Sequence, residues 1–205
     1  TGSANMALSL AELGIRCITI ENSKSALKQA NENIQNSLIK NKPLLLEMDA
    51  RNTTFLDDTF DFVIAYKTMH HIKNANLALD EMYRVCKPGG RIIIIEHSEI
   101  IRNAILLYTR ESGAQHPNHI DVSSISKIMG EKSGNLCSFD TEIGTILVFD
   151  KKGIKKTSCL VDNSSIIKIG GTDKRNFYYD YNNDCLSYSD EDDYIEIPIK
   201  KSNHN

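Results

Sequence analysis

The run Arg91-Ile-Ile-Ile-Ile-Glu96 restricts the fold of this chain more than any other segment. Four consecutive isoleucines leave no polar face, so a strand made of them must be covered on both sides. Strands of this kind belong to parallel sheets, in which strands alternate with helices along the chain. The run therefore predicts an α/β domain, and the segments before it are expected to alternate in the same way.

The first 90 residues contain this alternation. Short runs of strand-forming residues are separated by segments whose apolar residues recur at helical spacing. The expected strands are Cys17–Ile20, Leu44–Met48, Phe60–Ala65 and Arg91–Glu96. The expected helices are Asn5–Leu13, a segment capped by Ser23 with Leu27, Ala30, Ile34 and Leu38 as its apolar stripe, and Asn74–Cys86 ahead of Pro88-Gly89-Gly90.

The pattern changes after residue 96. Two helices and then two strands are expected there, namely Ile100–Arg110, Val122–Met129 behind the capping residue Asp121, Leu136–Ile143, and Thr145–Phe149 after Gly144. The two strands would form an antiparallel hairpin at one edge of the sheet. The fold class expected for residues 1–150 is therefore a Rossmann-like, doubly wound α/β fold with a mostly parallel sheet and an antiparallel edge strand.

Residues 151–205 differ from the rest of the chain. They carry runs of Asn, Ser, Asp and Tyr, an acidic stretch at Asp190–Asp193, and short strand-like pieces at Ser165–Ile169 and Tyr194–Ile199. Such a composition predicts either a small β-rich appendage or a partly disordered extension. We expect two parts, a domain over residues 1–150 and a C-terminal extension of unknown role over residues 151–205.

Ligands bind to doubly wound sheets at the carboxyl ends of the strands, so the residues at these ends are candidates for a site. Gly2 precedes the first expected helix, where it lets the backbone approach a ligand beside the N–H groups of the helix start. Glu21 follows a strand and lies 19 residues after Gly2, the spacing of an acid that binds ribose hydroxyls. Taken alone, Gly2 also suits a plain turn, and Glu21 an exposed surface position.

Asp49 ends the next strand and could accept a hydrogen bond from the exocyclic amine of adenine, with Ala50 leaving room for the ring. A turn-capping role is the alternative for this aspartate. If Gly2 is the second glycine of a dinucleotide fingerprint, the third glycine position holds Asn5 instead. This disfavours a pyrophosphate cofactor such as NAD and favours an adenosine-containing cofactor without phosphates.

Six segments follow one another in order: Thr1–Asn5, Glu21, Asp49–Ala50, Phe60–Val63, Met69–Ile72 and Glu81–Arg91. Together they resemble the class I S-adenosylmethionine-dependent methyltransferases, in particular the group of quinone-biosynthesis and other small-molecule enzymes. The resemblance covers about residues 1–150. It implies a seven-stranded sheet whose last strand is antiparallel, S-adenosylmethionine as the cofactor, and methyl transfer to a small-molecule acceptor.

The resemblance also implies roles for individual residues. Gly2 would lie under the methionine part of the cofactor, Glu21 would hold the ribose, and Asp49 the adenine. The full cofactor-binding set expected is Gly2, Ser3, Ala4, Glu21, Asn22, Asp49, Ala50 and Tyr66. Ala4 stands where many relatives have glycine, which is tolerable if its φ angle is negative.

The first strand of the family, with the first glycine of its loop, would lie upstream of Thr1. In the family this strand sits between those expected here at Cys17–Ile20 and Phe60–Ala65. We therefore expect the 205 residues to be truncated at the N-terminus. On their own they should fold poorly or be inactive, because two strand edges would lose their partner.

No catalytic residue can be assigned from the sequence, because the methyl group of a sulfonium is already activated and a base is needed only for some acceptors. His71 and His97 are the candidates on the acceptor side. His70 is expected to pack at a helix end. A metal site made by His97, His116 and His119 is not expected.

The composition limits the remaining function classes. A net charge of −3 does not favour nucleic acid as a partner, and no apolar run approaches the roughly 18 residues of a membrane span. Five cysteines without a C-x-x-C pair indicate reduced thiols in the cytoplasm. A homo-oligomer is left open. The alternatives to a methyltransferase are a methyltransferase-like binding or scaffolding protein without activity, and an NAD-dependent oxidoreductase.

Overall fold

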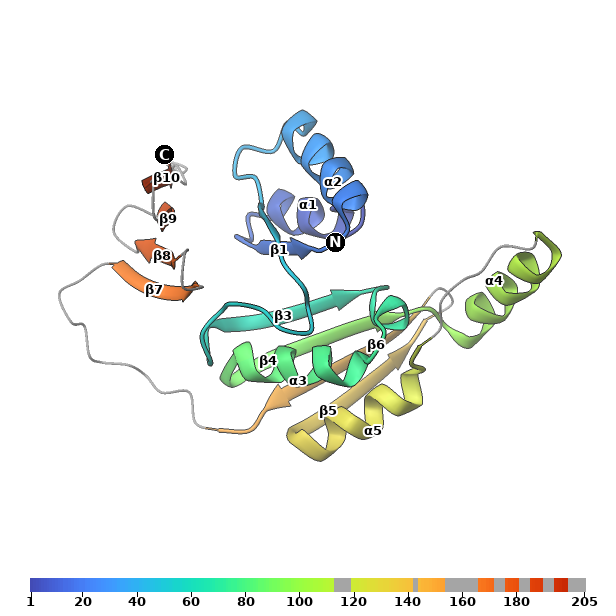
Figure 1. Cartoon of the computed structure of the whole chain (residues 1–205). Coiled ribbons are helices and arrows are strands. Elements are labelled where there is room, and N and C mark those ends of the chain that lie inside the picture. The colour runs from blue at the N-terminus through green and yellow to red at the C-terminus, as the bar shows by residue number, and fades with distance from the viewer. Residues whose placement is uncertain are drawn as a thin grey trace. The chain divides into compact units, whose positions relative to one another are not determined.

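The computed structural model describes residues 1–112, 119–141 and 144–153, together with the backbone of four strands between residues 166 and 198 (Figure 1). The chain divides into two compact units. The first unit consists of residues 1–49, 53–59 and 156–205, and the second of residues 50–52 and 60–155.

The N-terminal part of the first unit is a parallel pair of strands with two helices. In chain order its elements are α1 (Asn5–Glu12), β1 (Ile18–Glu21), α2 (Lys24–Asn36) and β2 (Leu44–Glu47). The two strands are in register from Ile18 opposite Leu44 to Glu21 opposite Glu47. Ala30 and Ile34 of the expected helical stripe are buried. They pack with Ala4 in a small core that Leu8 and Leu45 complete.

Two expectations for α2 are wrong. The helix ends at Asn36, so Leu38 is fully exposed instead of continuing the apolar stripe. Ser37 ends the helix because its backbone is extended and its hydroxyl donates to the carbonyl of Ile34. Ser23 holds the N-cap position, but its hydroxyl contacts that of Ser25 at 3.1 Å and makes no capping hydrogen bond.

The negative φ angle expected for Ala4 is not observed, because its φ angle is +65°. The residue is the left-handed N-cap of α1, a conformation that costs an L-residue about 1–2 kcal/mol. Its methyl group is buried beside Ala30 and Ile34. Burial of one methyl group stabilises the fold by about 0.8 kcal/mol, which offsets much of this cost.

The C-terminal strands take the β-rich form of the expected extension. They are β7 (Ile166–Gly171), β8 (Asn176–Asp180), β9 (Cys185–Ser189) and β10 (Tyr194–Pro198). They form an antiparallel sheet in the order β10-β9-β8-β7. The outer strands β7 and β10 overlap the two strand-like pieces of the sequence, and β8 and β9 lie between them.

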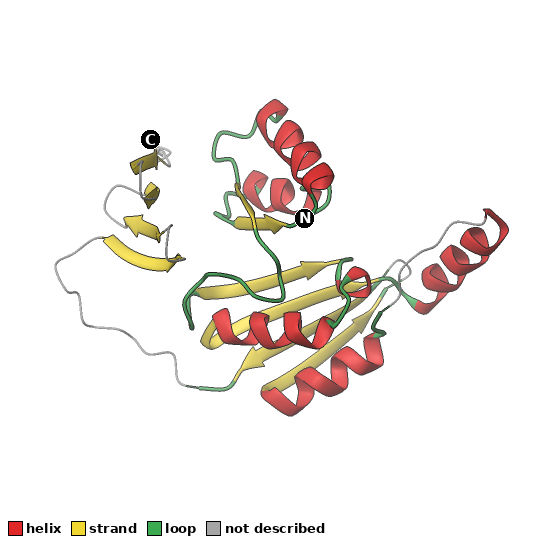
Figure 2. Cartoon of the chain, viewed as in Figure 1, coloured by secondary structure: helices red, strands yellow, loops and turns green. Residues whose placement is uncertain are grey.

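The second unit is built on a mixed sheet in the order β3-β4-β6-β5, shown in yellow in Figure 2. Its strands are β3 (Phe60–Tyr66), β4 (Cys86–Glu96), β5 (Ser133–Asp140) and β6 (Thr145–Lys151). β3 and β4 are parallel, and β6 runs antiparallel to both of its neighbours. This confirms the mostly parallel sheet that ends in an antiparallel hairpin. β1 and β3, the strands expected to flank the upstream strand of the family, belong to separate sheets.

The isoleucine run forms an interior strand of this sheet, but its two faces are not equally covered, contrary to expectation, because Ile93 and Ile95 are only half-buried. Ile92 and Ile94 of β4 are fully buried, and the helices α3 (Ala75–Val85) and α5 (Val122–Lys132) lie over one face of the sheet (Figure 1). The other helices of the unit are the short 3-10 helix η1 (Met69–His71) and α4 (Glu99–Ser112). None of the helices in the described part of the chain is long and apolar enough to span a membrane.

Some element boundaries differ from the expected ones. α3 ends at Val85, and β4 already begins at Cys86, which pairs with Phe60 before a register shift. The cap at Asp121 is confirmed, because its carboxylate accepts the N–H of Ser124 at 2.7 Å. This hydrogen bond is the main cause that lowers the pKa of Asp121.

Candidate functional site

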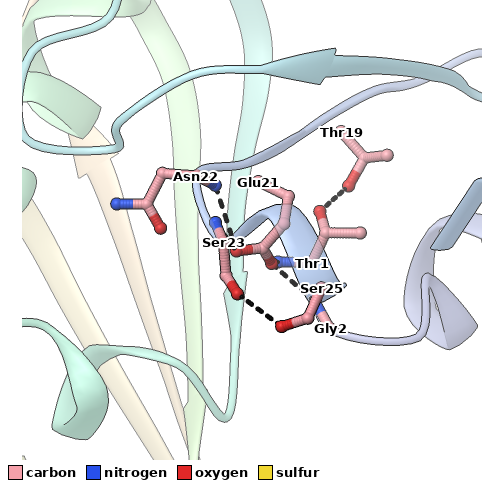
Figure 3. A network of polar contacts seen from close by, with 7 residues as sticks. All are labelled: Thr1, Gly2, Thr19, Glu21, Asn22, Ser23 and Ser25. Carbon is pink, nitrogen blue, oxygen red and sulfur yellow. Dashed lines mark hydrogen bonds and ion pairs between the residues drawn. The ribbon is translucent and has the colours of Figure 1, made fainter. Parts of the chain in front are cut away.

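Glu21 is the centre of a polar network at the carboxyl end of β1 (Figure 3). Its Oε2 accepts hydrogen bonds from the N–H of Gly2 at 2.9 Å and from the amino group of Thr1 at 3.0 Å. Its Oε1 accepts from the N–H groups of Asn22 at 3.0 Å and Ser23 at 2.9 Å. Four donors from the two sides of the carboxylate therefore fix its orientation.

The same donors set the charge of Glu21. Partial burial raises the pKa of the carboxyl group, but the hydrogen bonds from Ser23 and Gly2 and the Thr1 amino group outweigh burial. The pKa is lowered from the ordinary value as a result. Glu21 is therefore ionised at neutral pH and held beside the loop that precedes α1.

A pH dependence follows from this shift. Because the pKa of Glu21 is lower in the folded than in the unfolded chain, the ionised carboxylate stabilises the fold above the ordinary value of 4.5. This contribution is lost as the pH falls through the lower folded value. In urea unfolding followed by circular dichroism, the wild type should exceed Glu21→Gln in stability at neutral pH, and the two should converge in acid.

Glu47 offers the matched control for this experiment, because it lies opposite Glu21 on β2 and its side chain is exposed. Glu47→Gln should leave the pH dependence of stability unchanged. A difference between wild type and Glu21→Gln that stays constant down to acid pH would contradict the assigned shift.

Hydrogen bonds hold the loop before α1 on both sides. The side-chain amide of Asn33 in α2 donates to the carbonyl of Ser3 at 2.9 Å, and the hydroxyls of Thr1 and Thr19 are hydrogen-bonded to each other. Gly2 has a φ angle of +56°, and a Cβ added to it would meet no atom within 4 Å. Backbone conformation, rather than crowding, is thus the reason for glycine at this position.

Asp49 lies at the same edge of the parallel pair as Glu21. The N–H of Met48 donates to the backbone carbonyl of Glu21 at 3.0 Å, which extends the strand pairing by one residue beyond β2. Asp49 follows directly and is half-buried. The chain passes from the first unit to the second between Asp49 and Ala50, and Ala50 packs against the core of the second unit.

The structure thus joins some of the expected cofactor residues and separates others. Gly2, Glu21 and Asn22 share one hydrogen-bond network in the first unit. Ser3 and Ala4 lie in the same loop, and Asp49 lies at the same strand edge. Ala50 and Tyr66 belong to the second unit. The cofactor-binding roles of these eight residues stay predictions.

The acceptor-side candidates lie at the carboxyl ends of β3 and β4. Tyr66, which belongs to the expected cofactor-binding set, ends β3 at the same edge and is 40% exposed. His71 is exposed, and its ring centroid lies 4.1 Å from that of His70. His97 is half-buried, with its ring centroid 5.3 Å from that of His70. The structure therefore gathers three imidazoles at one edge of the sheet.

Sequence reasoning missed the role of Glu96. The carboxylate is 5% exposed and contacts His70, which is 6% exposed, at 2.5 Å. The available signal was a charged residue directly after four isoleucines. Of the metal trio considered above, His116 lies outside the described residues, and His119 donates its backbone N–H to the carbonyl of His70 at 3.0 Å. Residues 1–112, 119–141 and 144–153 contain no group of three or more His, Cys, Asp or Glu that could hold a metal ion.

Comparison with known families gives a match over the N-terminal part of the chain, somewhat less than half of its length. Residues 1–94 match the family described as the methyltransferase domain. This range includes the loop before α1, Glu21, Asp49 and all of the expected cofactor-binding residues.

Curated relatives resemble about two fifths of the chain. A phosphatidylethanolamine N-methyltransferase of Cereibacter sphaeroides is 33% identical over 78 residues, which cover 38% of this chain and 38% of the relative. A ubiquinone/menaquinone biosynthesis C-methyltransferase of Pectobacterium carotovorum is 34% identical over 85 residues, which cover 41% of this chain and 34% of the relative. The alignments thus span less than two fifths of the length of these relatives.

Solved structures share the fold at low sequence identity. The crystal structure of a protein described as a SAM-dependent methyltransferase from Methanosarcina mazei has a TM-score of 0.56 and is 17% identical. The alignment covers 75% of this chain and 90% of that protein. The Rossmann-like fold expected from the sequence is confirmed.

Proposed function

We propose that this chain, whose residues 1–94 form a class I S-adenosylmethionine-dependent methyltransferase domain of the quinone-biosynthesis-like group, transfers a methyl group from S-adenosylmethionine to a small-molecule acceptor. The observation that carries the proposal is the Glu21 carboxylate, ionised and oriented 19 residues beyond Gly2 at the end of β1. This is the position at which an acid accepts hydrogen bonds from ribose hydroxyls.

The residues of the first unit fit an adenosine-containing ligand. Glu21 supplies a fixed negative acceptor, and the loop from Gly2 to Ala4 supplies backbone groups with no bulky side chain. A carboxylate offers about four acceptor sites, and four N–H groups already donate to Glu21. A ribose hydroxyl would therefore share an oxygen atom with one of these donors. Asp49 would accept from the adenine amine.

The chemistry that S-adenosylmethionine supplies is a methyl group already activated on sulfur. What the protein must add is alignment of the acceptor behind the methyl group and exclusion of water. Positioning of this kind accounts for about 7–11 kcal/mol of a barrier. Acceptors of two kinds appear in the names of the relatives, an amine of a phospholipid and a carbon of a quinone precursor.

The decisive experiment compares cofactors and then acceptors. Calorimetric titration should show binding of S-adenosylmethionine and none of NAD. Transfer of a radiolabelled methyl group would then be measured to phosphatidylethanolamine in micelles and to a short-chain demethylmenaquinol. Binding of NAD in place of S-adenosylmethionine would make the chain an oxidoreductase. Binding of neither would make it a methyltransferase-like scaffold.

Asp49→Ala should weaken binding of S-adenosylmethionine and adenosine by about threefold to tenfold, because one hydrogen bond to the base is lost. Methionine, which lacks the base, should bind Asp49→Ala as it binds the wild type. Both affinities are measured by calorimetry. An equal loss for both kinds of ligand would mean that Asp49 acts through folding and would remove it from the site.

Location and partners complete the proposal. Cys17 and Cys137 are free thiols, which supports a reducing compartment such as the cytoplasm. The partner proposed is the small-molecule acceptor, and the net charge of −3 supports the expectation that nucleic acid is not bound.

A further inference from the structure

A cavity of about 460 Å³ lies in the second unit, where β4 begins its pairing with β6. Sites for small molecules span about 300–1,000 Å³, so the cavity has room for one. Its lining includes Arg91 of β4, Asp150 of β6 and Asn135 of β5. Arg91 is paired with Asp150, and Asp150 with Asn135, so the three residues form one row across the sheet.

The cavity carries an excess of positive charge. Three of the residues that line it are cationic, namely Arg91, Lys151 and Lys152, whereas Asp150 is the single carboxylate of the lining. The excess amounts to two positive charges, although the whole chain has a net charge of −3. The positive charge is therefore a local property of this part of the surface, and it favours an anion with two negative charges.

The guanidinium group of Arg91 is oriented but only partly used. Its Nε atom donates to Oδ1 of Asp150 at 2.8 Å, which fixes the plane of the group. A guanidinium also carries N–H donors on both of its Nη nitrogens. Within the part of the chain that the structure describes, these nitrogens make no hydrogen bond. The side chain is 50% exposed, so the fork of Nη donors is open to a ligand.

The two lysines of the lining differ in their freedom. Lys151 donates from Nζ to the carbonyl of Cys86 at 2.7 Å and lies 4.8 Å from the centroid of the Tyr83 ring. Lys152 is exposed and forms no ion pair with residues 1–112, 119–141 or 144–153. We therefore expect Lys151 to add to the positive potential and Lys152 to bind a ligand directly.

Gly153 brings the segment after β6 against the start of β4. Its φ angle is +135°, and a Cβ atom added to it would lie 2.7 Å from Cβ of Pro88. Only glycine permits this close approach. Gly153 and Gly89, the neighbour of Pro88, both line the cavity, so this part of its wall is made of backbone.

We propose that this cavity binds a small molecule through a phosphate monoester group, at a site additional to those of the proposed function. A phosphate monoester carries about −1.5 to −2 charges at pH 7, which matches the excess of the lining. The Nη fork of Arg91 suits two phosphate oxygens, and the ammonium group of Lys152 suits the third. A carboxylate or a phosphodiester brings one negative charge and should bind more weakly.

The cavity lies away from the acceptor-side candidates of the same unit. Arg91 opens the pairing of β4 with β6, and Glu96 closes it. The rise along a strand places these two residues about 17 Å apart. Occupation of the cavity should therefore leave the carboxyl end of β4 open, and binding of phosphate can be tested without cofactor or acceptor.

Titration of the full ¹⁵N-labelled chain, followed by nuclear magnetic resonance, tests the class of ligand. Inorganic phosphate and glycerol 3-phosphate are the dianionic probes, and diethyl phosphate and acetate are the monoanionic ones, all at matched ionic strength. The dianions should shift the amide signals of Gly89, Asn135, Lys152 and Gly153, with a Kd about tenfold lower than that of the monoanions. Equal affinity for all four probes, no shift, or shifts confined to the loop before α1 would overturn the proposal.

Substitutions then test the two direct contacts. Lys152→Gln should weaken binding of glycerol 3-phosphate about tenfold. Arg91→Lys keeps the charge but loses the planar fork, so it should weaken binding by about threefold or more. Both residues are exposed, so the variants should fold as the wild type does. An unchanged Kd in either variant would overturn the proposed contacts.

Lys127→Gln is the matched control. Lys127 is an exposed lysine of α5, so its replacement removes the same charge from the same unit at a position outside the cavity. The affinity of this variant for glycerol 3-phosphate should equal that of the wild type. Equal losses in Lys127→Gln and Lys152→Gln would mean that phosphate responds only to the net charge, and would overturn the site.

Discussion

Replacing Glu21 with alanine is expected to weaken the binding of S-adenosylmethionine at least tenfold. The carboxylate is ionised and already oriented, so its hydrogen bonds to the ribose would be charge-assisted and worth about 1.5–3 kcal/mol each. Loss of one such bond corresponds to about a tenfold loss of affinity, and loss of two to more. The measurement is calorimetric titration of the variant and the wild type.

Glu21 also holds the N–H groups of Gly2, Asn22 and Ser23, so its removal loosens the loop as well as the ligand contact. Glu47→Ala separates the specific effect from a general one, because it removes an exposed carboxylate from the neighbouring strand. The control should bind S-adenosylmethionine as the wild type does. Unchanged affinity in a correctly folded Glu21→Ala variant would exclude Glu21 from the site.

Gly90→Ala is expected to destabilise the second unit by about 3 kcal/mol, at the upper end of the usual cost of overpacking. A Cβ atom at this position would lie 2.8 Å from the carbonyl oxygens of Asp61 and Lys87 and 2.9 Å from the sulfur of Cys86. Two of these atoms are backbone atoms, so the strands β3 and β4 themselves would have to move. The expected loss is measured by urea unfolding.

Gly130→Ala provides a control that should change the free energy of unfolding in the opposite direction. Gly130 lies in α5, is exposed, and would place its Cβ atom in open space. Alanine should therefore stabilise the helix by about 0.5–1 kcal/mol. If both variants changed stability equally, crowding at Gly90 would not be the cause of the loss.

Much of the fold could be predicted because its strongest signals are local. The isoleucine run predicted an interior strand, in which Ile92 and Ile94 are fully buried and Ile93 and Ile95 half-buried, and Asp121 marked a helix start that its carboxylate does cap. The errors lie where a few atoms decide the outcome. Leu38 continued an apolar stripe, but the hydroxyl of Ser37 had already ended the helix. Ala4 adopts a left-handed backbone that no side-chain pattern reveals.

The candidate site was predictable only in part for the same reason. The sequence predicts the end of β1 and the spacing between Gly2 and Glu21. The structure brings both residues into one hydrogen-bond network. The pairing of Glu96 with His70 depends on two strands lying side by side, 26 residues apart in sequence. Periodicity placed Glu96 at the end of a buried strand but could not supply its partner.

The central position of β4 affects which parts of the second unit can open. The strand is hydrogen-bonded to β3 on one side and β6 on the other, and its side chains Ile92 and Ile94 are fully buried. Segments held in this way exchange their amide hydrogens only when the whole cooperative unit unfolds, whereas edges and loops open by local fluctuations. Glu96 lies at the end of this interior strand, so we expect its contact with His70 to persist when the edges of the unit open.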